Sequence, residues 1–458
     1  MANPKSQQFK LTKAHITADR FGGFENKFFD VKNQVAEINI YESIEEPSLS
    51  GTIAIVDDKS LYELINFNGT ERIKIEMAGL GKDTDPVFEK TFIMTNIVRQ
   101  LKGNDKSSIY VFDIIDEHGF ISSAERLRSA YRGRIDDIVK GICLTRLNKS
   151  VDISYQLLFG FRSKKVDAIQ DDIRVIIPNL SPINAIKWLL SRATTQTGSP
   201  FYLWATIHDE NLRMGNLDVM YRQVPFNDKL PYTYNPSNVN VAEDKSEFEQ
   251  GFTIKALGLG EMGDTLHMVT NGTVGASQGI TNLNTGQITQ QHYDVQKTID
   301  NLDKQDIIIR RNQNVFDNKL KLKDKFIGDY EAQHIHQVVS TGTYGKFKSY
   351  HDEFEEGKHL KKLESNSIRD LLVKNMMSIT VPGTAFFLGK AAVGDTVNLN
   401  VVNDNLEVGK QSNADDMLDK NKSGKHLIYD LRHTFRGTQH DVTMNVCKLE
   451  REPWTRNF

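Results

Sequence analysis

The sequence predicts a mainly β protein of the α+β class, with a small antiparallel β domain of the barrel or sandwich type on either side of other material. Two observations predict this fold. Near both ends of the 458-residue chain, apolar residues alternate with polar ones in short runs, as expected for strands with one buried face. Between these runs the apolar spacing first becomes helical and then gives way to a polar, highly charged segment.

The first β region extends to about residue 118. Its strands are predicted from apolar residues two positions apart, bounded by turn residues: Ile38 and Ile40; Ile53 and Ile55; Ile73, Ile75 and Met77; Tyr110, Phe112 and Ile114. Ser60 is followed three residues later by Glu63, which is the arrangement of a capping box and predicts one short helix. Residues 1–118 are therefore expected to form the first β domain.

Residues 119–240 differ in character and predict an α+β domain. Apolar residues fall at helical spacing over residues 122–147, which indicates two helices joined at Gly133. Ser181 followed by Pro182 is typical of a helix start, because serine caps the helix and proline fits its first position. A hairpin is predicted from two apolar runs that flank a polar turn, residues 201–207 and 217–221.

The end of the chain returns to strands after a polar insertion. Residues 252–257 have the pattern of a strand, and alternating runs return after residue 378. Residues 271–292 are rich in Gly, Ser, Thr, Asn and Gln and predict a loop or an arm, whereas residues 359–377 predict a helix. We therefore expect a second β domain formed by residues 241–270 and 377–458, interrupted by an insertion of polar loop and helices at residues 271–376.

Composition limits the possible functions. The chain has 57 basic and 60 acidic residues and a net charge of -3, so free DNA or RNA is a poor candidate partner. Cys143 and Cys447 lie in separate apolar runs and fit small buried hydrophobes, not a disulfide or zinc site. The N-terminal residues lack the apolar core of a signal peptide, and no apolar run is long enough to span a membrane. A soluble protein made in a reducing cytoplasm is expected.

One glycine motif suggests a nucleotide site at first sight. Residues 258–263 match the G-x-G-x-x-G pattern and follow a predicted strand. Dinucleotide binding requires a helix to begin directly after the glycines, so that its N-terminus faces the pyrophosphate. Residues 264–269 have instead the pattern of another strand. We therefore interpret the motif as a glycine-rich turn and expect no cofactor.

The histidines and acidic residues form no recognisable catalytic or metal-binding pattern. His334 and His336 share one face of a strand but have no obvious third ligand, so a solvated pair is expected. Three further histidines recur every seven residues along predicted strands, where that spacing is accidental: His426, His433 and His440. The acidic run at residues 352–356 predicts a solvated face, and no hydrolase or P-loop motif occurs. The sequence therefore predicts no catalytic, cofactor-binding or metal-binding residues, and no enzyme.

The order of these elements resembles the baseplate hub proteins of contractile-tailed bacteriophages. In the first β region the resemblance covers the hairpin, the short helix and the next strand, at residues 38–57, 61–65 and 68–75. In the middle and at the end it covers residues 177–182, the helix bearing Trp188, the runs 201–204 and 218–220, and residues 379–383 and 393–397. No single segment is a chemical signature. The specificity lies in the order of the parts, which covers most of the chain outside residues 271–360.

The resemblance implies two tube-like β domains in each chain, so that three chains present six. Such a homotrimer would match a hexameric tail tube on one side and a trimeric tail spike protein on the other. It would line a channel through which DNA passes without specific binding. Baseplate wedge proteins and the tape measure protein are further implied partners. The implied location is the virion tail after synthesis in the host cytoplasm, with no membrane insertion.

Three alternatives remain open from the sequence. The hub of a type VI secretion or phage-derived injection particle would share the fold, although no β-helical needle precedes Phe458, which favours a separate spike chain. A tail-associated cell-wall hydrolase is a second alternative. A carbohydrate-binding module is the third, but it would carry clustered exposed tryptophans and the chain has only Trp188, Trp204 and Trp454. The polar insertion departs from the family and is either an arm that contacts other baseplate proteins or a surface decoration.

Overall fold

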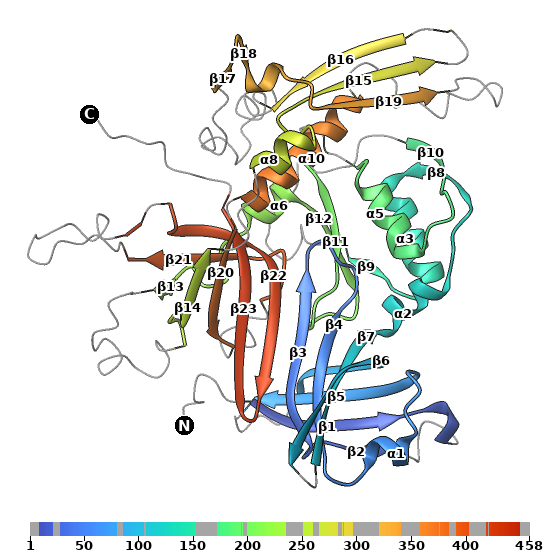
Figure 1. Cartoon of the computed structure of the whole chain (residues 1–458), viewed down its shortest axis with the longest axis vertical. Helices are drawn as coiled ribbons and strands as arrows, with labels where there is room; N and C mark the ends of the chain where they lie inside the picture. Colours follow the sequence, from blue (N-terminus) through green and yellow to red (C-terminus); the bar gives the residue numbers. More distant parts are fainter. Residues whose placement is uncertain are drawn as a thin grey trace, which may run out of the picture.

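The computed structural model describes most of the chain and confirms a mainly β fold with large antiparallel sheets (Figure 1). The described residues are 9–21, 28–79, 86–104, 107–152, 172–193, 195, 199–234, 251–259, 265–282, 286, 288–295, 320–339, 358–374, 376–383, 391–402, 418–419 and 421–448.

One almost entirely antiparallel sheet dominates these residues. Its strands follow the order β14-β20-β23-β22-β3-β4-β7-β6-β5-β1-β2, and β21 and β13 extend it beside β22. Their bounds are β1 (Phe9–Thr17), β2 (Phe29–Asp30), β3 (Val35–Ser43), β4 (Ser50–Asp57), β5 (Glu71–Gly79), β6 (Pro86–Asn104), β7 (Ser107–Asp116), β13 (Tyr232–Tyr234), β14 (Ala256–Leu259), β20 (Met376–Pro382), β21 (Thr396–Val401), β22 (Gly424–Arg436) and β23 (Gln439–Cys447). The sheet therefore contains strands from both ends of the chain.

The predicted strands of the first region are confirmed, but the sequence analysis missed β1 and β6. Both strands contain bulges, and each bulge shifts the side-chain alternation by one residue. In β1 the register shifts between Leu11 and Lys13, and in β6 it shifts three times, first between Met94 and Asn96. A period of two is therefore lost along each strand, although each pairs with at least one neighbouring strand over most of its length.

The middle of the chain contains helices and short strands beside the main sheet. Their bounds are α2 (Glu117–Ala124), β8 (Ala130–Arg134), α3 (Ile135–Arg146), β9 (Val151–Asp152), β10 (Asp172–Ile176), α5 (Pro182–Leu190), β11 (Phe201–Trp204), β12 (Leu212–Asn216) and α6 (Leu217–Arg222). The start of α5 is confirmed, because the Ser181 hydroxyl accepts a hydrogen bond from the Asn184 amide at 3.4 Å. Two other expectations about this part of the chain are wrong.

First, the two predicted helices are not joined at Gly133. Gly133 lies in β8, which pairs with β10, and the paired strands take up the apolar residues that had suggested a continuous helix. Second, the partner of β11 in the hairpin is β12, and residues 217–221 belong to α6. The Asn216 side chain accepts from the Val219 amide and so caps that helix, which overrides its strand-like pattern.

The insertion is more ordered than its composition suggested. It contains β15 (Gly275–Asn282), β16 (Ile288–Asp294), β17 (Lys321–Leu322), β18 (Lys325–Phe326), η4 (Ile327–Asp329), β19 (Gln333–Val339) and α10 (Lys358–Lys374), and α8 (Thr265–Thr270) directly precedes it. The polar run expected as a loop or an arm thus forms β15 and β16, and β15 pairs with β16 on one edge and β19 on the other. The helix predicted near its end is confirmed as α10, whereas the acidic run at residues 352–356 lies outside the described residues.

Two large hydrophobic cores hold these parts together. The first lies under β1 to β7 and extends to the middle helices, with Ile53, Ile75, Ile142 and Ile186 among its buried residues. The second lies under β20 to β23 and includes side chains from α6 and α10. A smaller core between α8, α10 and β15 closes the insertion.

A short helix, α1 (Leu61–Ile65), covers part of the first core as predicted, but its cap differs from the expected one. Ser60 has a left-handed backbone with φ of 54° and its side chain makes no capping hydrogen bond. Asp57 caps the helix instead: one carboxylate oxygen accepts from the Leu61 amide at 2.7 Å and the other from the Tyr62 amide at 3.0 Å. An acidic cap also suits the positive end of the helix dipole.

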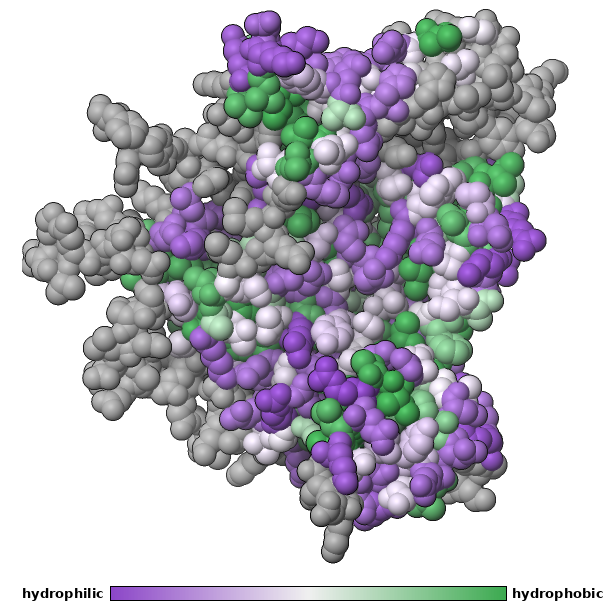
Figure 2. Space-filling view, viewed as in Figure 1, coloured by the Kyte–Doolittle hydropathy of each residue, from purple (hydrophilic) through white to green (hydrophobic). Residues whose placement is uncertain are grey.

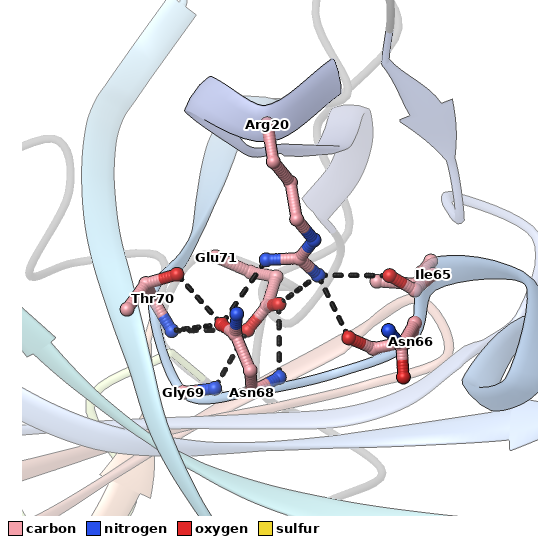
Figure 3. A network of polar contacts seen from close by, with 7 residues as sticks. All are labelled: Arg20, Ile65, Asn66, Asn68, Gly69, Thr70 and Glu71. Atoms are coloured by element: carbon pink, nitrogen blue, oxygen red, sulfur yellow. Dashed lines mark hydrogen bonds and ion pairs between the residues drawn. The ribbon is translucent and has the colours of Figure 1, made fainter.

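The turn that follows α1 is organised by a buried carboxylate (Figure 3). Glu71 has no exposed surface and accepts backbone hydrogen bonds from Asn68, Gly69 and Thr70 at 3.0–3.1 Å. Arg20 forms an ion pair with the same carboxylate and also donates to the carbonyl oxygens that end the helix. This network fixes the entry into β5 because every buried polar atom in the turn has a partner.

We expect Asp57→Ala to lower the free energy of unfolding by about 1–2 kcal/mol, because it removes the acceptor of two helix amides. Ser60→Ala, at the position that the sequence pattern favoured, should change it by less than about 0.5 kcal/mol. Urea unfolding of both variants compares the two sites. Equal losses, or a larger loss for Ser60→Ala, would show that serine is the cap.

Candidate assembly interface

Two parts of the main sheet share one strand topology. The N-terminal β module is defined here as β3 to β7, and the C-terminal β module as β14 with β20 to β23. In the sheet their orders are β3-β4-β7-β6-β5 and β14-β20-β23-β22-β21, and every neighbouring pair is antiparallel. Numbered along the chain, both modules have the order 1-2-5-4-3. The two modules therefore repeat the same arrangement.

The modules are joined edge to edge by β22 and β3, which lie side by side in the middle of Figure 1. One end of β22 pairs with β21 within its own module, where Leu427 lies opposite Thr396. The remaining length, Asp430 to Arg436, pairs antiparallel with Ser43 to Glu37 of β3. The fourth strand of one module thus also serves as the edge on which the first strand of the next module is added.

The equivalent strand of the N-terminal module, β6, has an open edge. Its first part pairs with β5 up to Met94, and its far part pairs with β7 as far as Asn104. Among the described residues, 95–104 of β6 therefore have a strand on one side only. Val98 and Leu101 in this segment are 53% and 46% exposed. A long, exposed edge with apolar side chains is a site at which another strand is readily added.

The other end of the path, β14, has an open edge as well. Within the described part of the chain it pairs only with β20. The path from β14 to β6 contains eight antiparallel strands, so its two terminal strands run in opposite directions. An edge of β6 in one copy could therefore pair with β14 of another and keep the alternation unbroken.

One face of this eight-stranded path is polar. Across the joint between the modules it carries Glu37, Asn39, Tyr41, Ser43, Ser50, Thr52, Asp430, Arg432, Thr434, Arg436, Asp441, Thr443 and Asn445. Part of this face forms a hollow of about 370 Å³ that crosses β3 and β22.

The charges on this polar face are paired with one another. Arg436 forms an ion pair with Glu37, and Lys255 pairs with Asp441 at 2.5 Å. Arg432 donates to the Asn39 side-chain oxygen at 3.1 Å. Burial raises the pKa of Asp430, which also lies on this face. Among the described residues, the face is therefore hydrophilic without an excess of Lys and Arg over Asp and Glu side chains that could hold phosphate groups.

On the opposite face, a polar joint separates the two cores. Along β3, Ile40 belongs to the first core and Ile44 to the second, and Glu42 lies between them with its side chain fully buried. Along β22, His433 occupies the same place between Leu431 and the first-core residue Phe435. The His433 Nε2 atom lies 3.3 Å from the Glu42 carboxylate.

This joint also holds two loops. The Glu42 carboxylate accepts from the backbone amide of Ile207, after β11, at 3.1 Å and from that of Val393, before β21, at 3.4 Å. His440 on β23 stacks on His433, and their Nε2 and Nδ1 atoms are 3.2 Å apart. Glu42 therefore connects the middle of the chain and both β modules at one buried point.

The heptad-spaced histidines are thus not equivalent. The β22–β23 hairpin brings His433 and His440 together, whereas His426 is buried near the start of β22 and contacts the Gly424 carbonyl oxygen at 2.9 Å. Sequence reasoning missed the contact because it depends on strand register. In the described part of the chain, no group of three or more His, Cys, Asp or Glu side chains is placed to hold a metal ion.

The glycine motif requires a correction. Residues 260–263 lie outside the described residues, but the segment after them forms helix α8, not the expected strand. A strand and a helix therefore do flank the glycines. Even so, β14 pairs antiparallel with β20, whereas a dinucleotide fold places such a strand in a parallel sheet. The interpretation as a turn stays a prediction.

The remaining predicted positions are located as follows. His334 is exposed on β19, in contact with the Ser277 hydroxyl, and the side chain of His336 lies outside the described residues. Cys143 and Cys447 are free and buried as predicted, and burial raises the pKa of Cys143 to about 12. No helix among the described residues is both long and apolar enough to cross a membrane.

Comparison with solved structures gives matches over nearly the whole chain at low sequence identity. A tail protein from Neisseria meningitidis matches with a TM-score of 0.49 and 11% identity, covering 96% of this chain and 97% of the other. A 43 kDa prophage tail protein from Shewanella oneidensis matches with a TM-score of 0.47 and 10% identity, covering 95% and 98%. An E. coli component of the type VI secretion system, described as structurally similar to bacteriophage tail proteins, matches with a TM-score of 0.38 and 8% identity, covering 98% and 78%.

Sequence comparisons give no such match. No family model matches the chain, and no curated protein sequence matches it.

Glu42→Gln should lower the free energy of unfolding by about 2–4 kcal/mol. Each carboxylate oxygen of Glu42 accepts from one backbone amide, and the NH2 group of glutamine can replace neither acceptor, so one buried N–H would lose its partner. The matched control is Glu46→Gln. Glu46 pairs with Lys187 at 2.5 Å but is half exposed, so its loss should be below about 1 kcal/mol. Urea unfolding at pH 7 measures both, and a loss below 1 kcal/mol for Glu42→Gln would contradict the structural role of the joint.

The buried histidines predict a loss of stability in acid. Burial lowers the pKa of His208 to about 4, that of His426 to about 3, and that of His440 well below its usual value. The folded state then binds fewer protons than the unfolded state between about pH 6.5 and pH 4, so stability falls as the pH falls through this window. Asp116, with a pKa raised to about 7, and the adjacent His118, with a pKa lowered to about 4, oppose each other.

Each of the histidines His208, His426 and His440 should contribute a slope of up to about 1.4 kcal/mol per pH unit in this window. Urea midpoints measured from pH 7.5 to pH 4.5 check this dependence, and His426→Gln should make the slope shallower. A stability that stays constant down to pH 4.5 would refute the expected protonation states.

Proposed function

We propose that this chain is the structural central hub of a contractile phage tail baseplate. Three copies form a ring that presents six β modules to a hexameric tail tube and a threefold surface to a trimeric spike. The ring surrounds a channel for DNA. The chain acts by assembly and has no enzymatic activity.

The repeated topology of the two β modules is the observation that supports this proposal. Within one chain, the fourth strand of the C-terminal module pairs with the first strand of the N-terminal module, β22 with β3. The equivalent strands at the far ends of the sheet are β6 and β14, and both have open edges among the described residues. Pairing β6 of one copy with β14 of the next repeats the internal joint between chains.

The same repeat supports a ring of three copies. Each chain contributes two modules related by one joint, and a ring with six modules needs three chains. Closure removes the open edges of β6 and β14, which is the physical advantage of a ring over an open trimer or a chain of copies. Since the path in each chain has eight strands, the antiparallel order continues around the whole ring.

The polar face is the surface that we assign to the channel. Its arginines and lysine are paired with carboxylates or with an amide oxygen, as described above. Binding of nucleic acid through phosphates requires free Lys or Arg side chains. A wall with paired charges therefore lets DNA pass without holding it.

The ring should depend on the open edge of β6. The double variant Val98→Lys/Leu101→Lys places two charges on that edge, and we expect it to remain monomeric while the unchanged chain forms trimers at micromolar concentration. Mass photometry measures the distribution. Leu144→Lys/Ile176→Lys, at two apolar sites that lie outside this edge and are 60% and 57% exposed, is the matched control and should still form trimers.

Cross-linking provides a direct test of the pairing itself. Ala256→Cys on β14, combined in turn with Val98→Cys or Leu101→Cys on β6, should give covalent trimers on oxidation for at least one of the two pairs. The native cysteines are buried and should not interfere. A chain that stays monomeric at micromolar concentration, with no ring in assembled particles, would overturn the proposal.

A further inference from the structure

A small hairpin projects from the outer end of the insertion. It consists of β17 and β18, in which Lys321 lies opposite Phe326 and Leu322 opposite Lys325. Lys323, in the connecting turn, has a left-handed backbone with φ of 57°. Figure 1 shows this hairpin beyond the sheet formed by β15, β16 and β19.

Lysines and apolar residues alternate along this hairpin. Lys321, Lys323 and Lys325 are exposed, and Asp324 is the acidic residue between them. The apolar residues are exposed as well: Leu320 and Leu322 to 46%, and Phe326 to 44%. In Figure 2 a strongly hydrophilic group at the top of the molecule lies directly beside a hydrophobic patch. The hairpin thus combines a local positive charge with apolar surface, in a chain whose net charge is negative.

The contacts of the hairpin anchor its backbone and leave these side chains outside. The Tyr330 hydroxyl donates to the Leu322 carbonyl oxygen at 2.5 Å, and the Asp329 carboxylate accepts from the Phe326 amide at 3.1 Å. Lys321 lies over the Phe326 ring at 4.8 Å. Two strands of two residues each gain little stability by themselves, so these backbone contacts hold the hairpin in an exposed position.

We propose that this hairpin binds the surface of an anionic lipid bilayer without crossing it. Lysine is a point charge without the fixed geometry of arginine, and it is attracted to an anionic lipid surface wherever it approaches. Leucine and phenylalanine beside the lysines can enter the boundary between headgroups and acyl chains. Nucleic acid would use the lysines but would leave two exposed leucines in water, so it fits this surface less well. The inference does not depend on the proposed ring.

Vesicle co-sedimentation with the full chain tests this proposal. Binding to phosphatidylglycerol vesicles should be at least about tenfold stronger than binding to phosphatidylcholine vesicles. It should weaken as the salt concentration is raised from about 50 mM to about 500 mM, because salt screens the attraction between the lysines and the lipid. Lys321→Glu/Lys323→Glu/Lys325→Glu should weaken binding roughly a hundredfold, because each lysine near an anionic surface contributes about 1 kcal/mol to the binding free energy. Leu320→Ser/Leu322→Ser should also weaken it, at unchanged charge.

A second triple variant controls for net charge. Lys10→Glu/Lys59→Glu/Lys229→Glu makes the same charge change at exposed lysines elsewhere and should bind the vesicles like the unchanged chain. Thermal unfolding of each variant verifies the fold. The proposal fails if anionic vesicles do not bind, if both triple variants lose binding equally, or if the hairpin lysines matter only for binding to a 20-base-pair DNA duplex (roughly two helical turns) offered in parallel.

Discussion

The pairing of β22 with β3 is the interaction on which the rest of the structure depends. It joins strands that are almost four hundred positions apart, since Arg436 lies opposite Glu37, and it makes one continuous sheet from the two ends of the chain. The long connection between these strands contains the middle helices and the insertion, which must therefore pack around the sheet. Such a distant backbone pairing requires a large loss of chain entropy, so the surrounding contacts have to favour one register strongly.

The buried Glu42 and His433 provide that selection. A shift of β22 by one residue would turn His433 to the polar face and leave the Glu42 carboxylate without this neighbour. A shift by two residues would move a leucine or phenylalanine against the carboxylate and break the separation of the two cores. An apolar joint would tolerate such slips more easily, because leucine can replace isoleucine at little cost. The polar joint thus exchanges some stability for a defined relation between the modules.

The sequence was sufficient to predict elements whose alternation is unbroken, such as β3, β4 and β7, and the helix start at Ser181. It failed at β1 and β6 because bulges shift the phase of alternation, and at α8 because six residues with Leu266, Met268 and Val269 fit a helix and a strand equally well. It failed at β15 because that strand is buried by pairing on both edges, although Ser277 and Gln278 are polar. The joint at Glu42 could not be found from sequence, since its amide donor Val393 is 351 positions away.

The position of the insertion adds a constraint on the proposed ring that the repeated topology alone does not give. It lies between the first and second strands of the C-terminal module, β14 and β20, whereas the same two strands of the N-terminal module are joined by a short turn between β3 and β4. Modules that are equivalent in their sheets are therefore unequal at this end. In a ring of six modules only every second one would carry an insertion, so the sheet would present sixfold order while the surface around the insertions would have threefold order. In the proposed ring, a single chain would meet partners of both symmetries for this reason: the repeated strands would provide one, and the unrepeated insertion would provide the other.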